Sequence, residues 1–124
     1  MVALALLKIA VPFALISCFS TPFELKHALK VTKATVLFTT CQFAPEALPV
    51  AQEAGITMSR IFVMCGRLGN YGTVDGLIEK AHRMQNKNSK PRAVPKDTLA
   101  LLFFSSGTTG LPKGETTNYS CLDT

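Results

Sequence analysis

The chain has 124 residues and a formal net charge of +5. This length suits one modest domain, and the 48% of hydrophobic residues argues against an intrinsically disordered chain. The excess of lysine and arginine is concentrated in residues 80–96, where polar residues and prolines accompany it but no Phe, Tyr or Trp does. Because no Phe, Tyr or Trp is interleaved there to stack on bases, we interpret residues 85–97 as a solvated basic linker and expect no nucleic-acid partner.

The amino-terminal segment Val2–Phe19 is almost continuously apolar and about long enough to cross a bilayer as a helix. Lys8 and Pro12 interrupt it, and the charge of a signal peptide should precede the apolar region. We therefore predict a buried helix over Ala3–Ala10, ended by Pro12, and a buried strand over Phe13–Cys18. With no convincing signal peptide and no peroxisomal carboxy-terminal signal, we expect an intracellular protein; membrane association through this segment is the alternative.

Helices and strands are predicted to alternate along the next part of the chain. One helix is predicted to start with Thr21 as its N-cap and Pro22 at its first helical position. Glu24 has the spacing that completes a capping box with Thr21, and the helix runs to about Lys33. The later elements are a strand over Val36–Thr39, a helix over Pro45–Ala54 ended by Gly55, a strand over Arg60–Met64, a helix over Val74–Met84 and a strand over Leu99–Phe104. This alternation predicts an α/β fold with a partial parallel sheet and right-handed βαβ crossovers.

The last predicted strand, which we expect to be buried on both faces, leads directly into a loop with the composition of a phosphate-binding site. Ser105–Gly110 reads SSGTTG, and Pro112 and Lys113 follow. Hydroxyls and closely approaching backbone N–H groups can bind phosphate oxygens, and a lysine adds positive charge. A Walker A loop is excluded, because Pro112 stands where its second glycine would be.

The string Phe104–Gly114 resembles the phosphate-loop signature of the AMP-forming adenylating enzymes, which include the acyl- and aryl-CoA ligases. The order of upstream elements is similar to the amino-terminal domain of 4-coumarate–CoA ligase-like enzymes. The resemblance implies that residues 1–114 are part of the large AMP-binding domain. After Gly114 the family continues with an apolar strand, whereas this chain has Glu115 and further polar residues. We therefore expect residues 115–124 to be a divergent, disordered tail.

The resemblance also implies an activity. Family members use ATP and Mg²⁺ to convert a carboxylic acid to an acyl-adenylate and then commonly form a thioester with CoA. The residues that correspond to the ATP phosphate contacts are Ser105, Ser106, Gly107, Thr108, Thr109 and Lys113. Other motifs of the family, including its catalytic lysine, have no counterpart in these residues, so no catalytic residue and no acid substrate can be assigned.

These features leave three hypotheses open. The first is a truncated AMP-dependent ligase that carries the phosphate loop but is inactive alone. The second is a non-catalytic module that associates with a membrane, and the third is weak nucleotide binding without turnover.

The cysteines and histidines suggest no further site. Cys18, Cys41, Cys65 and Cys121 are irregularly spaced, form no Cys-x-x-Cys pair, and are joined by only two histidines, His27 and His82. This pattern does not indicate zinc binding, and we expect no metal site and four buried free thiols.

Overall fold

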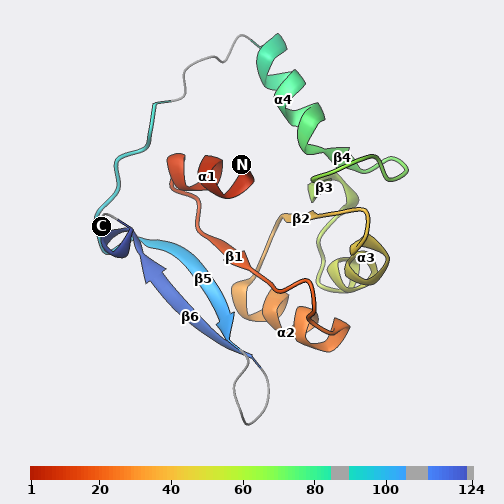
Figure 1. Cartoon of the computed structure of the whole chain (residues 1–124), viewed down its shortest axis with the longest axis horizontal. Coiled ribbons are helices and arrows are strands. Elements are labelled where there is room, and N and C mark those ends of the chain that lie inside the picture. Colours follow the sequence, from red (N-terminus) through yellow and green to blue (C-terminus); the bar gives the residue numbers. More distant parts are fainter. Residues whose placement is uncertain (85–89, 106–111, 123–124) are drawn as a thin grey trace. The chain divides into compact units, whose positions relative to one another are not determined.

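The computed structural model describes residues 1–84, 90–105 and 112–122 (Figure 1). The chain divides into two compact units. One comprises Met1–Ser17 together with Asn88–Thr124, and the other comprises Cys18–Lys87. Each unit has its own three-stranded sheet.

The Cys18–Lys87 unit is built around a parallel sheet with the order β2-β3-β4. Leu37 of β2 pairs with Ile61 of β3, and Val63 of β3 pairs with Thr73 of β4. Helix α3 connects β2 to β3, so the predicted βαβ arrangement is present here. The elements are α2 (Pro22–Thr32), β2 (Leu37–Thr39), α3 (Ala44–Glu53), the 3-10 helix η1 (Met58–Arg60), β3 (Ile61–Val63), β4 (Gly72–Thr73) and α4 (Val74–Arg83).

Helix α2 begins as its sequence predicts. The Thr21 hydroxyl accepts a hydrogen bond from the Glu24 N–H at 3.3 Å, and the Thr21 N–H donates to the Glu24 carboxylate at 2.7 Å. Pro22 occupies the first turn, where a missing N–H leaves no helical bond unmade. The helix ends at Thr32, because Lys33 adopts a left-handed conformation.

Helices α2 and α3 and strand β3 supply most of the buried residues of this unit. Ala28 and Leu29 of α2 are buried, as are four residues of α3 and both ends of β3, Ile61 and Val63. Small side chains on α3 allow close packing. The buried residues of α3 are Ala44, Ala47, Val50 and Ala51.

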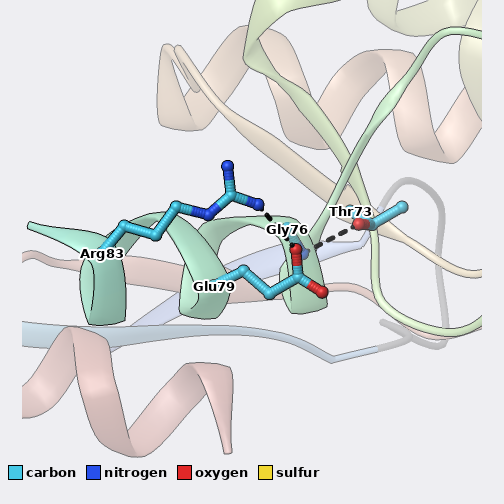
Figure 2. A network of polar contacts seen from close by, with 4 residues as sticks. All are labelled: Thr73, Gly76, Glu79 and Arg83. Carbon is cyan, nitrogen blue, oxygen red and sulfur yellow. Dashed lines mark hydrogen bonds and ion pairs between the residues drawn. The ribbon is translucent and has the colours of Figure 1, made fainter.

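Helix α4 is held at its start by a local cap and along its surface by one ion pair (Figure 2). The Thr73 hydroxyl accepts a hydrogen bond of 3.0 Å from the Gly76 N–H. One helical turn further on, the Arg83 guanidinium lies 3.3 Å from the Glu79 carboxylate. No residue of α4 is buried, so local interactions carry much of its stability.

The other unit contains a mixed sheet with the order β1-β5-β6. β1 pairs parallel with β5, with Phe13 opposite Leu101, and β6 pairs antiparallel with β5. The Tyr119 hydroxyl donates a hydrogen bond to the Leu7 carbonyl, and the Arg92 N–H donates to the Lys8 carbonyl, so α1 is joined to this unit. The elements are α1 (Val2–Lys8), β1 (Phe13–Leu15), β5 (Leu99–Ser105), β6 (Lys113–Asn118) and η2 (Tyr119–Cys121).

The amino-terminal predictions need correction. Helix α1 has no buried residue, and it ends at Lys8, where Ala10 adopts a positive φ and the Val11 N–H bonds back to the Leu6 carbonyl. The helix therefore ends before Pro12. β1 is only three residues long and partly exposed. Among the residues that the structure describes, no helix combines the length and apolar character needed to cross a membrane.

Two further predictions were wrong at the carboxy-terminal end. β5 is not buried on both faces: Ala100 and Leu101 are buried, but Phe103 is 43% exposed. Residues 115–122 are not a disordered tail, since β6 pairs with β5 and η2 follows it. The cross-strand ladder supplies partners for the backbone of a polar segment that has no apolar alternation of its own. Residues 90–97 of the predicted linker contain no helix or strand, and residues 85–89 lie outside the described residues.

Candidate phosphate-binding site

The pairing of β5 with β6 brings together the two flanks of the predicted phosphate loop. Ser105, the last residue of β5, is the register partner of Lys113, the first residue of β6. Directly opposed residues of an antiparallel pair have Cβ atoms about 4.5–5.5 Å apart and project to the same face. A hydroxyl and an ammonium group therefore project side by side at the end of this hairpin.

Four of the predicted contacts lie in the connection between the two strands. These residues, Ser106, Gly107, Thr108 and Thr109, lie outside the described residues. The structure consequently locates only Ser105 and Lys113 of the six predicted contacts. Both of these side chains are exposed.

A carboxylate that the sequence did not single out as a site residue lies beside Ser105. The Ser105 hydroxyl donates a hydrogen bond of 3.2 Å to the Glu115 carboxylate. Glu115 is two residues from Lys113 on β6, so both side chains belong to the same face of the sheet. The site thus combines one positive and one negative side chain around a hydroxyl. Only the pairing of β6 with β5 shows that Glu115 belongs to this site, because its sequence neighbours are polar and predict a tail.

The site lies at the carboxyl end of β5 and next to that of β1. Leu15, the last residue of β1, pairs with Phe103, two residues before Ser105. In parallel α/β sheets, ligands bind beyond the carboxyl ends of the strands. The hairpin therefore projects its polar groups from the edge at which this class of fold binds ligands.

The donor chemistry at the hairpin fits an anion. The Ser105 hydroxyl and the Lys113 ammonium can both donate to phosphate oxygens, whereas the Glu115 carboxylate repels them and competes for the Ser105 proton. The described part of the chain contains no group of three or more side chains suited to hold a metal ion. The expectation of buried thiols was wrong: Cys18, Cys65 and Cys121 are exposed, and Cys41 is half-buried.

Comparison with known proteins identifies the family. Residues 1–119 match the family model described as AMP-binding enzyme. The chain is 30% identical over 95 residues to the peroxisomal OPC-8:0-CoA ligase 1 of Arabidopsis thaliana. That match covers 77% of this chain but only 17% of the relative.

Solved structures of adenylate-forming enzymes share the fold. A natural red emitting luciferase from Phrixothrix hirtus aligns with a TM-score of 0.79 and 24% identity, over 94% of this chain and 29% of the luciferase chain. An anthranilate CoA ligase in complex with anthranoyl-AMP aligns with a TM-score of 0.78 and 22% identity, over 94% of this chain and 22% of the ligase chain. The predicted α/β class with partial parallel sheets is thereby confirmed. With a match that extends over nearly its whole length, the chain belongs to the AMP-binding enzyme family.

Proposed function

We propose that this chain provides the ATP phosphate site of an adenylate-forming acid–thiol ligase. The proposal assigns the phosphate contacts to Ser105, Ser106, Gly107, Thr108, Thr109 and Lys113. The register pairing of Ser105 with Lys113 is the observation that supports it, because this pairing joins the first and last of these residues across one hairpin.

The role of these residues is electrostatic. In adenylate formation a carboxylate attacks the α-phosphate of ATP, pyrophosphate leaves, and negative charge is redistributed over the phosphate oxygens. The Lys113 ammonium stabilises that charge, and the Ser105 hydroxyl donates to a phosphate oxygen after exchanging its present acceptor, Glu115. We assign no Mg²⁺ ligand to the described residues.

The name of the curated relative supports a proposal about the reaction class. We propose a carboxylic acid as the substrate and CoA as the acyl acceptor, in keeping with the CoA ligase match. The 124 residues contain no counterpart of the family's catalytic lysine, so we expect them to bind nucleotide without forming an adenylate. ATP–pyrophosphate exchange with a panel of carboxylic acids should therefore give no signal with this chain alone.

The binding part of the proposal can be tested by calorimetric titration of the full 124-residue chain with MgATP. A charge-assisted contact to phosphate contributes about 1.5–3 kcal/mol, so Lys113→Ala should weaken binding by about tenfold or more. Lys90→Ala is the matched control. It removes the same charge from an exposed residue that precedes β5 in the same unit.

The comparison of the two lysine variants decides the outcome. A loss of affinity confined to Lys113→Ala supports a phosphate site at the hairpin. Affinities equal to that of the wild type in both Lys113→Ala and Lys90→Ala would contradict it. Equal losses in the two variants would indicate non-specific attraction of ATP to a basic chain.

A further inference from the structure

We propose that Cys41 and Cys65 form an oxidation site, in which a peroxide converts the two thiols to a disulfide at the carboxyl edge of the β2-β3-β4 sheet. Both cysteines belong to the Cys18–Lys87 unit, so the inference does not depend on the phosphate site of the other unit. The two residues are remote in sequence, separated by 24 positions, and the fold brings them together.

The pairing of β2 with β3 leads the two cysteines to the same edge of the sheet. The register of β2 and β3 ends with Thr39 opposite Val63, and the Met64 N–H continues the ladder by donating to the Thr39 carbonyl at 2.7 Å. Cys41 and Cys65 each follow two residues after that last pair. Adjacent strands lie about 4.8 Å apart. At the last register pair this spacing falls within the Cα separation of about 4.4–6.8 Å that disulfides require, and the two cysteines follow that pair closely.

A direct contact supports this placement. The Cys41 thiol donates a hydrogen bond to the Cys65 carbonyl at an Sγ–O distance of 3.0 Å. A Cβ atom at position 66 would lie 3.2 Å from the Cys41 sulfur. Because Gly66 has no Cβ atom, the Cys41 thiol can lie close to the backbone at this position. Gly66 adopts a positive φ of 77°, which turns the chain immediately after Cys65.

The difference in exposure between the two thiols indicates which of them reacts first. Cys65 is exposed and Cys41 is half-buried, so a peroxide reaches Cys65 first. Hydrogen peroxide oxidises the Cys65 thiol to a sulfenic acid and is itself reduced to water. The Cys41 sulfur then attacks the Cys65 sulfur, the S–S bond forms, and the hydroxyl leaves as a second water with the Cys41 proton. Two thiols thereby lose two electrons to one peroxide.

Peptide mapping can test the pairing in the full chain, because trypsin places each cysteine in a different peptide. The chain is treated with one equivalent of hydrogen peroxide, free thiols are alkylated, and linked peptides are quantified by mass spectrometry. Cys41 lies in residues 34–60, Cys65 in 61–67, Cys18 in 9–26 and Cys121 in 114–124. The expected product joins 34–60 to 61–67.

The sequence offers an internal control for chance pairing. Cys41 is 24 residues from Cys65 and 23 from Cys18, so both disulfides close loops of nearly equal entropy in an unfolded chain. We expect the Cys41–Cys65 product to exceed the Cys18–Cys41 product by roughly tenfold under native conditions and by less than about twofold in guanidinium. Equal native and denatured ratios would overturn the proposal.

Two sets of variants complete the test. A Cys18→Ser, Cys121→Ser double variant should retain the linked peptide. Cys41→Ser should abolish it and leave a Cys65 sulfenic acid that dimedone traps. Loss of the product in the double variant, or trapping at Cys65 to the same extent with and without Cys41, would contradict the assigned pairing.

Discussion

The Ser105 hydroxyl donates a 3.2 Å hydrogen bond to the carboxylate of Glu115 across the β5–β6 hairpin. Ser105 is also the register partner of Lys113. A residue assigned to phosphate binding is therefore engaged by a negative side chain that lies on the same face as the lysine. A phosphate that binds here must replace the Glu115 carboxylate as the acceptor of the Ser105 hydrogen bond. It must also approach the negative charge of that carboxylate.

We therefore expect Glu115→Gln to strengthen the binding of ATP. Two unit charges about 4 Å apart in a solvent-exposed setting interact by about 1 kcal/mol, which corresponds to a gain of roughly fivefold in affinity. Calorimetric titration of the full chain with MgATP measures the change. The gain should shrink at high salt, because exposed charges are screened.

Glu79→Gln is the matched control for this variant. It removes the same charge from α4, where Glu79 is paired with Arg83 at the surface, and it should leave the affinity for ATP unchanged. A weaker affinity of Glu115→Gln would contradict repulsion and would indicate that the carboxylate assists nucleotide binding, for example by binding Mg²⁺.

The capping box of α2 should make stability depend on pH in the acidic range. A hydrogen bond from the Thr21 N–H, and to a smaller extent one from the Thr21 hydroxyl, holds the pKa of Glu24 below its ordinary value of 4.5. A carboxyl group whose pKa is lower in the folded state stabilises the fold above the unfolded pKa, and this contribution is lost as the pH falls through the folded pKa.

Urea unfolding of the wild type and of Glu24→Gln at a series of pH values can check this expectation. The wild type should be the more stable of the two above pH 4.5, and the difference should diminish as the pH is lowered below that value. A difference that stays constant from neutral pH to pH values well below 4.5 would show that the charge of Glu24 is not responsible.

Gly72→Ala should destabilise the Cys18–Lys87 unit, because a Cβ atom there would lie 2.7 Å from the Cδ1 and 2.8 Å from the Cε1 of Phe62. The Phe62 ring stacks on Phe38 with centroids 5.6 Å apart, which limits its ability to move aside. Overpacking of this kind costs about 1–3 kcal/mol. Gly114→Ala is the control, since its Cβ would make an ordinary contact of 3.5 Å with Phe104.

The two tyrosines allow this effect to be assigned to one unit. Tyr71 belongs to the Cys18–Lys87 unit and Tyr119 to the other. In urea titrations followed by NMR, Gly72→Ala should lower the midpoint reported by the Tyr71 ring. A midpoint equal to that of the wild type would show that Phe62 accommodates the added methyl group.

Helix α4 should depend more on its cap than on its ion pair. Thr73→Ala removes the acceptor of the Gly76 N–H and should reduce helix stability by about 1 kcal/mol, whereas Thr73→Ser should retain it. Arg83→Ala should cost less than about 0.5 kcal/mol, because the paired side chains are 80% and 67% exposed. Hydrogen exchange of the α4 amides measures both effects, and a larger loss of protection in Arg83→Ala than in Thr73→Ala would reverse this ranking.

Local sequence signals predicted the elements that local interactions stabilise. The start of α2 could be predicted to the residue, because Thr21, Pro22 and Glu24 satisfy the helix terminus among themselves. The strand around Leu99 was also predicted, because a short apolar run bounded by turn residues is typical of one. The exposure of Phe103 on this strand could not be predicted, because burial depends on which elements cover each face of the sheet.

The chain's own residues were thus sufficient to indicate the capped helix and the family signature at Phe104–Gly114, since each depends on neighbours within a few positions. They also indicated the α/β class, which follows from the alternation of such local signals along the chain. The strand at Lys113–Asn118 and the carboxylate of Glu115 beside Ser105 could not be recognised in the same way. Nor could the approach of the Cys41 thiol to Cys65. These features arise when strands pair across the sheet, and polar strands of this kind obtain their partners from the fold and not from their own periodicity.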